Sequence, residues 1–135
     1  MDLEQDRLAK WHTFVQEKDP QALAEALAED VVFHSPVLWK PKVGKAEAML
    51  YISSAAHVLE DFTYLRQFHH DQGVVLEFRA HIGSLIVKGV DIIQLNADGQ
   101  ISDFEVMVRP ARGLEALAAA MVQQLALATS TASEE

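Results

Sequence analysis

Residues 88–110, KGVDIIQLNADGQISDFEVMVRP, contain two alternating runs of apolar and polar residues separated by a turn signal. Asp98-Gly99 between two such runs indicates a β-hairpin, because glycine readily adopts the positive φ that tight hairpin turns need. For a turn of two or four residues, the predicted register places Asp91 opposite Val106. One face of the hairpin then carries a nearly all-apolar set of side chains: Val87, Asp91, Ile93, Phe104, Val106 and Val108.

Asp91 is the acidic exception on this face. Aspartate is uncommon in strands, and an unpaired buried carboxylate costs several kcal/mol. Inside a cavity its pKa would rise, and the carboxyl group could donate a hydrogen bond to a ligand oxygen or transfer a proton. Alternatively, a backbone group, a water molecule or a basic residue satisfies it. The sequence leaves both interpretations open. The other face of the hairpin carries polar residues: Lys88, Gln94, Asp103, Glu105 and Arg109.

The rest of the chain predicts an α+β fold in the order α-α-β-α-β-β-β-β-α. Apolar periodicity and end signals predict four helices, over residues 3–18, 21–29, 45–60 and 111–128. Alternation and turn signals predict five strands, over residues 31–36, 62–71, 74–82, 85–96 and 100–109. Short turns between the later strands indicate an antiparallel meander with helices on one face. We expect one domain over residues 3–128 and a frayed tail over residues 129–135.

Composition excludes several classes of function. The chain has 135 residues, no cysteine and a formal net charge of -9. Without cysteine there is no disulfide, thiolate metal site or cysteine nucleophile. We expect no nucleic-acid partner, because the 11 Lys and Arg residues form no evident basic patch. The sequence has no apolar run of membrane-spanning length and no signal-peptide pattern, which predicts a cytoplasmic protein.

Cofactors and metals are not expected either. The six histidines show neither HxH nor HExxH spacing, so we predict no metal site. No glycine-rich phosphate loop is present, so a nucleotide cofactor is not predicted. His57 could act as an acid or base at a cavity mouth, or be a partly exposed helix residue. Tyr64 could supply a hydroxyl to a cavity or simply pack.

Large apolar side chains from the first helix and from several strands are predicted to surround Asp91. Trp11 and Phe14 lie on the same apolar stripe of the first helix. The strand residues of the set are those expected on the same face of the sheet as Asp91. The predicted ligand-binding side chains are Trp11, Phe14, Phe33, Phe78, Val87, Phe104 and Val106.

Three stretches carry a resemblance to a known superfamily: DPQALAEALAEDVVFHSP at 19–36, VGKAEAM at 43–49 and GVDIIQLNADGQISDFEVMVRP at 89–110. Together they resemble the nuclear transport factor 2-like superfamily, and most of all its SnoaL-like polyketide cyclases and ketosteroid isomerases, over residues 3–125. The resemblance implies a cone-shaped curved antiparallel sheet packed on three to four helices, also described as cystatin-like. It further implies a conical pocket for a small, largely apolar molecule and a homodimer formed through the outer sheet face.

The isomerase site residues can be carried over one by one. The acidic hydrogen-bond donor matches Asp91, and the helix tyrosine falls at Trp11, whose indole N–H can still donate. The general base falls at Ser35, which cannot act as a base at neutral pH without activation. Ser35 remains a ligand-binding candidate. The resemblance implies cofactor-free proton transfer by Asp91, of isomerase, cyclase or dehydratase type, or alternatively a non-catalytic ligand-binding or protein-interaction domain.

Overall fold

The computed structural model describes residues 8–134. Residues 3–7 of the first predicted helix lie outside this range. Four helices are present in the described range: α2 (Ala9–Glu17), α3 (Pro20–Ala26), α4 (Lys45–Val58) and α5 (Ala111–Glu134). Six strands accompany them: β1 (Leu27–His34), β2 (Lys42–Val43), β3 (Glu60–His70), β4 (Gly73–Ile82), β5 (Leu85–Leu95) and β6 (Ile101–Arg109). The α+β class predicted from the sequence is confirmed.

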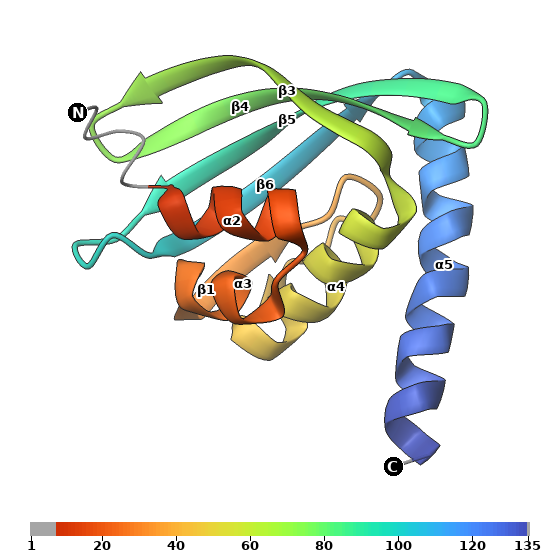
Figure 1. The fold of residues 1–135 in the computed structure, drawn as a ribbon, viewed down its shortest axis with the longest axis horizontal. Helices are drawn as coiled ribbons and strands as arrows, with labels where there is room; N and C mark the ends of the chain where they lie inside the picture. The colour runs from red at the N-terminus through yellow and green to blue at the C-terminus, as the bar shows by residue number, and fades with distance from the viewer. Residues whose placement is uncertain (1–7, 135) are drawn as a thin grey trace.

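The six strands form one curved, unclosed sheet in the order β2-β1-β6-β5-β4-β3. Strands β3 to β6 form the predicted antiparallel meander, whereas β1 pairs with β6 in parallel. Helices α2, α3 and α4 lie against one side of the sheet, as Figure 1 shows. Helix α5 packs mainly on α4 at one end, and its C-terminal part extends beyond the rest of the fold (Figure 1).

The predicted pairing of Asp91 is confirmed, but the turn is not the predicted two or four residues. Leu95 pairs with Ile101 across a five-residue connection, and a register shift between Gln94 and Leu95 restores the predicted parity. Asp91 pairs with Val106 across β5 and β6, and Ile93 pairs with Phe104. Gly99 has a φ of 80°, and its N–H donates to the carbonyl oxygen of Asn96, which closes the turn. Asp91 therefore lies on the helix-covered side of the sheet and is only 4% exposed.

Several predicted boundaries were wrong. Helix α3 ends at Ala26 and not at residue 29, because β1 already begins at Leu27, which pairs with Ile101 of β6. The short strand β2 lies where a loop was predicted, and it is held by pairing to β1. Helix α5 continues to Glu134, beyond the predicted end at residue 128.

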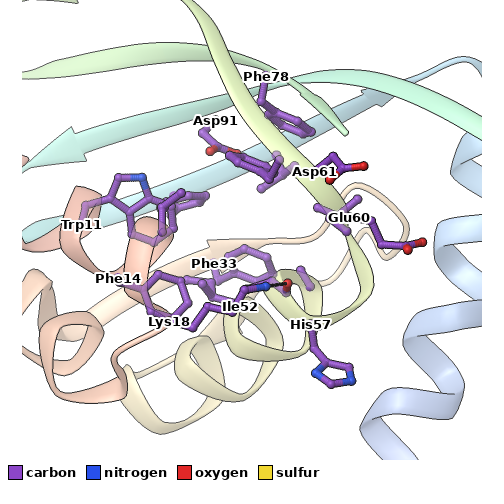
Figure 2. A pocket seen from close by; sticks show the side chains of 17 residues that line it. Trp11, Phe14, Lys18, Phe33, Ile52, His57, Glu60, Asp61, Phe78 and Asp91 are labelled. Carbon is purple, nitrogen blue, oxygen red and sulfur yellow. Dashed lines mark hydrogen bonds between the residues drawn. The ribbon is translucent and has the colours of Figure 1, made fainter. Parts of the chain in front are cut away.

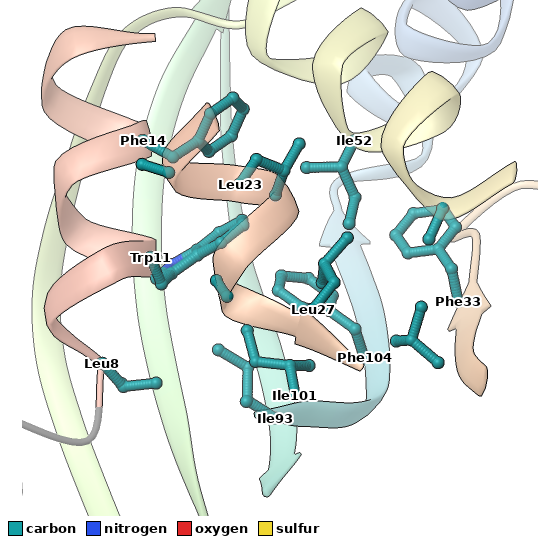
Figure 3. Close-up of a cluster of buried hydrophobic side chains, with 14 of the residues drawn as sticks. Leu8, Trp11, Phe14, Leu23, Leu27, Phe33, Ile52, Ile93, Ile101 and Phe104 are labelled. Carbon is teal, nitrogen blue, oxygen red and sulfur yellow. The ribbon is translucent and has the colours of Figure 1, made fainter. Parts of the chain in front are cut away.

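The main core lies between the sheet and helices α2, α3 and α4 (Figure 3). Four aromatic rings are linked through it: Trp11 is 4.9 Å from Phe104 and 5.4 Å from Phe14, and Phe104 is 6.0 Å from Phe33, between ring centroids. Tilted aromatic pairs of this kind stabilise a core beyond their area burial alone. The same rings form part of the wall of the cavity described below.

None of the helices in the described range covers the outer side of the sheet. Phe68, Ile86 and Met107 are each about half exposed there. Between them, Arg66 donates two hydrogen bonds of 2.6 Å to the largely buried carboxylate of Glu77. The predicted homodimer through this face remains a prediction.

Within the described range, no helix is both long and apolar enough to cross a bilayer. The cytoplasmic location remains a prediction.

Candidate functional site

A cavity of about 340 Å³ lies between the helix-covered side of the sheet and helices α2 and α4. Its wall is mostly aromatic and aliphatic, and Figure 2 shows the side chains that form it. Its volume is at the lower end of the roughly 300–1,000 Å³ typical of small-molecule sites. The apolar part of the wall consists of Trp11, Phe14, Val15, Phe33, Ile52, Ala55, Ala56, Leu59, Phe62, Phe78, Phe104 and Val106.

Asp91 is the one buried titratable residue of this wall. The strand alternation of β5 turns it inward, between Leu76 of β4 and Val106 of β6. Tyr64 of β3 donates a hydrogen bond of 2.6 Å to Asp91 Oδ2. The Trp11 indole N–H in turn donates to the Tyr64 hydroxyl oxygen at 2.9 Å. Three elements therefore meet in one chain of hydrogen bonds that ends on the carboxyl group.

Burial has the largest effect on the pKa of Asp91. It raises the pKa of Asp91 from its ordinary 3.8 to about 7, although the hydrogen bond from Tyr64 acts in the opposite direction. Burial, and secondly the charge of Asp91, also raises the pKa of Tyr64 well above 10, so Tyr64 keeps its proton. Near neutral pH the cavity therefore contains a carboxyl group that is partly protonated.

The remaining polar side chains of the wall lie at its rim. Lys18, His57, Glu60 and Asp61 are all exposed. Figure 2 shows the His57 ring and the Glu60 carboxylate pointing away from the aromatic interior. Lys18 Nζ donates to the carbonyl oxygen of Ala56 at 2.6 Å, which ties α2 to α4. The interior thus has one acid–base group and the rim has several.

Most side chains predicted for the site line the cavity. Besides Asp91 they are Trp11, Phe14, Phe33, Phe78, Phe104 and Val106 from the apolar set, with His57 at the rim.

Ser35 and Val87 do not line the cavity. The Ser35 hydroxyl oxygen accepts hydrogen bonds from the backbone N–H groups of Val37 and Leu38, because the chain turns there after β1. Val87 is fully buried in a second cluster with Leu59 and Leu117. The facing of Val87 was right, but α5 covers that end of the sheet.

Tyr64 contacts Asp91 and not the cavity itself, and sequence reasoning did not foresee this role. Simple alternation would place Tyr64 and Arg66 on one face of β3. In the structure Tyr64 pairs with Phe78 and Arg66 pairs with Glu77, so Leu65 is an extra residue that bulges. The bulge leaves Tyr64 facing inward and turns Arg66 outward. The bulge at Leu65 can be recognised only from the pairing of β3 with β4, and not from the sequence of β3 itself.

In the described part of the chain, no three His, Asp or Glu side chains come together as a possible metal site.

The comparisons with known proteins agree with this geometry. A family model described as the SnoaL-like domain matches residues 8–104. The chain belongs to the SnoaL-like domain family. No protein of curated function matches the sequence.

Solved structures support the assignment of this SnoaL-like domain. A steroid delta-isomerase from Pseudomonas aeruginosa is 40% identical, with a TM-score of 0.89 and 93% of each chain covered. An uncharacterised protein with a cystatin-like fold from Silicibacter pomeroyi is 33% identical, with a TM-score of 0.83, 87% of this chain and 84% of the other covered. The predicted resemblance and fold class are confirmed.

A more distant structure shares the fold alone. The epoxide hydrolase/cyclase-like enzyme SalBIII, which acts in pyran ring formation in salinomycin, is 19% identical, with a TM-score of 0.66, 82% of this chain and 92% of the other covered. Solved structures with the fold of this SnoaL-like domain thus include a protein named as an isomerase and a cyclase-like enzyme.

Proposed function

We propose that this SnoaL-like domain binds a small, largely apolar molecule in the cavity and that Asp91 hydrogen-bonds an oxygen atom of that molecule. The observation that carries this proposal is the position of Asp91: one buried carboxyl group in a wall whose other charged side chains lie at the exposed rim. Apolar cavities with a few well-placed polar groups are the usual form of small-molecule sites, in which the polar group fixes orientation.

The hydrogen bonds of Asp91 support this role. Within the described residues, its carboxyl group has Tyr64 as its hydrogen-bond partner, through Oδ2. Oδ1 has no hydrogen-bond partner among the described residues, and a ligand oxygen in the cavity can supply the hydrogen bond that it lacks. A fused-ring molecule with one ketone or hydroxyl group has the size and polarity that fit this site.

The test compares two aspartate variants. Asp91→Ala removes the proposed anchor, and Asp103→Ala is the matched control, because Asp103 lies on the adjacent strand and contacts His34 at 3.0 Å. Native mass spectrometry of protein from its own host would identify a carried molecule, and calorimetry would then measure its affinity. We expect Asp91→Ala to weaken binding about tenfold, roughly the effect of losing one hydrogen bond. Wild-type affinity in Asp91→Ala would contradict the anchor role.

A second candidate function is cofactor-free proton transfer on that ligand. Two observations favour it: the pKa of Asp91 near 7, which suits a general acid or base at neutral pH, and the 40% identity to a protein named as a steroid delta-isomerase. An isomerisation of this type moves one proton between two carbon atoms and leaves no net oxidation or reduction. Ser35 lies outside the cavity wall, so Asp91 is the acid–base group available inside it.

A β,γ-unsaturated 3-ketosteroid is the probe for this second function, with the absorbance of the conjugated product as readout. Turnover by the wild type that is lost in Asp91→Asn and kept in Asp103→Asn supports catalysis. Binding of the steroid without any turnover would instead favour a non-catalytic ligand-binding domain.

We also propose a homodimer through the outer sheet face. Half-exposed apolar side chains lie on that face at Phe68, Ile86 and Met107, and an exposed apolar patch is costly in a monomer. Phe68→Glu combined with Ile86→Glu should reduce the mass measured by light scattering to that of a monomer. Val122→Glu on α5 is the matched control, since Val122 is equally apolar and 69% exposed. A monomeric wild type would contradict the proposal.

A further inference from the structure

We propose that Trp11 and Tyr64 are positioning residues that hold the acidic proton of Asp91 on Oδ1, so that the cavity prefers a ligand with a hydrogen-bond acceptor oxygen, such as a ketone, over one with a hydroxyl donor. This inference rests on the proposed function, because it specifies which oxygen chemistry Asp91 recognises. Trp11 and Tyr64 then do more than pack in the core or the cavity wall, because they decide which oxygen of Asp91 carries the proton.

Trp11 is the first donor of the hydrogen-bond chain and fixes the direction of the bonds that follow. An indole N–H can donate a hydrogen bond but cannot accept one. The distance of 2.9 Å from Trp11 Nε1 to the Tyr64 hydroxyl oxygen therefore fixes that oxygen as the acceptor. A tyrosine hydroxyl has a single hydrogen, and this hydrogen must point elsewhere.

The Tyr64 hydrogen points to Asp91. The Tyr64 hydroxyl oxygen lies 2.6 Å from Asp91 Oδ2, which is a short distance typical of a strong O–H···O bond. Burial keeps Tyr64 protonated, because the pKa of Tyr64 lies well above 10. Oδ2 is therefore held as an acceptor whether Asp91 is neutral or ionised.

Because Oδ2 accepts from Tyr64, the position of the Asp91 proton is decided at the other carboxyl oxygen, Oδ1. In a neutral carboxyl group the carbonyl oxygen is the better acceptor, so accepting from Tyr64 favours the proton of Asp91 on Oδ1. Oδ1 has no partner among the described residues, and Asp91 lines the cavity. Neutral Asp91 thus offers the cavity a donor, and a ketone oxygen can accept from it, whereas a hydroxyl group would have to bind as an acceptor with its own hydrogen unpaired.

Among the described residues, no other charged group near the cavity competes for this role. Lys18 just after α2, His57 of α4, and Glu60 and Asp61 of β3 are exposed at the rim. His12 of α2 stacks on the Tyr64 ring at 6.1 Å between centroids, and burial lowers the pKa of His12, so it is mostly neutral where Asp91 titrates. None of the five has a hydrogen bond to Asp91 in the structure.

The first test measures the pKa of Asp91 by carbon-13 NMR of the side-chain carboxyl group, without any ligand. Tyr64→Phe removes the hydrogen bond that stabilises the carboxylate, so we expect the pKa of Asp91 to rise by about 1–2 pH units. Trp11→Phe should raise it less, because Tyr64 can still donate. An unchanged pKa in Tyr64→Phe would overturn the inference, because it would show that Tyr64 donates no hydrogen bond to the carboxylate of Asp91.

The second test uses a matched pair of probes, 2-tetralone and 2-tetralol, at pH 5.5, where most of Asp91 is neutral. We expect the wild type to bind the ketone about tenfold more tightly, roughly the effect of one unpaired hydrogen-bonding group. In Trp11→Phe the Tyr64 hydroxyl is free to rotate and accept, so the ratio should fall to within about threefold of unity. Phe14→Leu is the control: it alters the cavity wall but not the chain, so both affinities should change together.

The outcomes separate the two proposals. Suppose that neither probe binds the wild type but the pKa of Asp91 does respond to Tyr64→Phe. The chain of hydrogen bonds then stands, but the ligand preference inferred from it is overturned. The proposed function is overturned with it for this ligand class. If both probes bind with a ratio that Trp11→Phe leaves unchanged, the proposed function survives and the positioning role is overturned. If Trp11→Phe does not fold, Tyr64→Phe carries the ratio test, because it removes the hydroxyl hydrogen that Trp11 directs onto Oδ2 of Asp91.

Discussion

Replacing Asp91 with asparagine should stabilise the protein at alkaline pH. The folded state raises the pKa of Asp91 to about 7, whereas the ordinary value of 3.8 applies to the unfolded chain. Between these two values the folded state binds more protons than the unfolded state, so stability falls as the pH rises. Above pH 7 both states are ionised and the loss is complete.

The magnitude follows from the two pKa values. They differ by roughly 3 pH units, and at 1.36 kcal/mol per unit the ionised carboxyl group destabilises the fold by about 4 kcal/mol above pH 7. At pH 5 only about 1.6 kcal/mol of this has developed. Asparagine is neutral throughout and can still accept from Tyr64. The gain in stability of Asp91→Asn over the wild type should therefore grow by about 3 kcal/mol from pH 5 to pH 8.

The assay is urea denaturation of both proteins at half-unit steps from pH 5 to pH 8, followed by circular dichroism. Comparing the two proteins at each pH cancels other titrations. His12 requires this, because its lowered pKa makes stability rise with pH below 6.5, opposite in sign to Asp91. A difference between the two proteins that stays constant over this range would refute the conclusion that Asp91 titrates near pH 7.

Two further predictions concern packing. Phe104→Ala removes a ring that is 2% exposed and contacts both Trp11 and Phe33, so we expect a loss of about 3–5 kcal/mol in urea denaturation; a loss below 1 kcal/mol would contradict its place in the core. Gly89→Ala places a methyl group against the Phe78 ring and the Met107 carbonyl oxygen, so we expect a loss of about 1–3 kcal/mol and a shifted Phe78 ring in a crystal structure. Wild-type stability with an unmoved ring would refute the second.

The hairpin of β5 and β6 was predictable because its register is a local property. Asp98-Gly99 locates the turn, and the register shift beside it compensates for the odd length of the connection, so the later pairs keep the predicted parity. The inward position of Asp91 followed from nine residues on either side of that turn. Its neighbours Phe104 and Val106 were correctly placed with it.

The partners of Asp91 could not be predicted in the same way. Tyr64 is 27 residues from Asp91, and Trp11 is 53 residues from Tyr64, so no local pattern relates them. The bulge at Leu65 decides which face of β3 Tyr64 occupies, and the pairing with β4 decides the bulge. Ser35 was misplaced for a related reason, since the turn after β1 takes up its hydroxyl group.

The buried carboxyl group links stability to binding through one equilibrium. Desolvation of Asp91 destabilises the folded chain above pH 7, and the same desolvation keeps a proton available for a ligand oxygen below it. Two unrelated measurements should therefore change slope at the same pH. The affinity for 2-tetralone should begin to fall at the pH where the stability difference between the wild type and Asp91→Asn levels off. Break points more than about one pH unit apart would mean that a group other than Asp91 controls binding, because one titrating group has one pKa in the free protein.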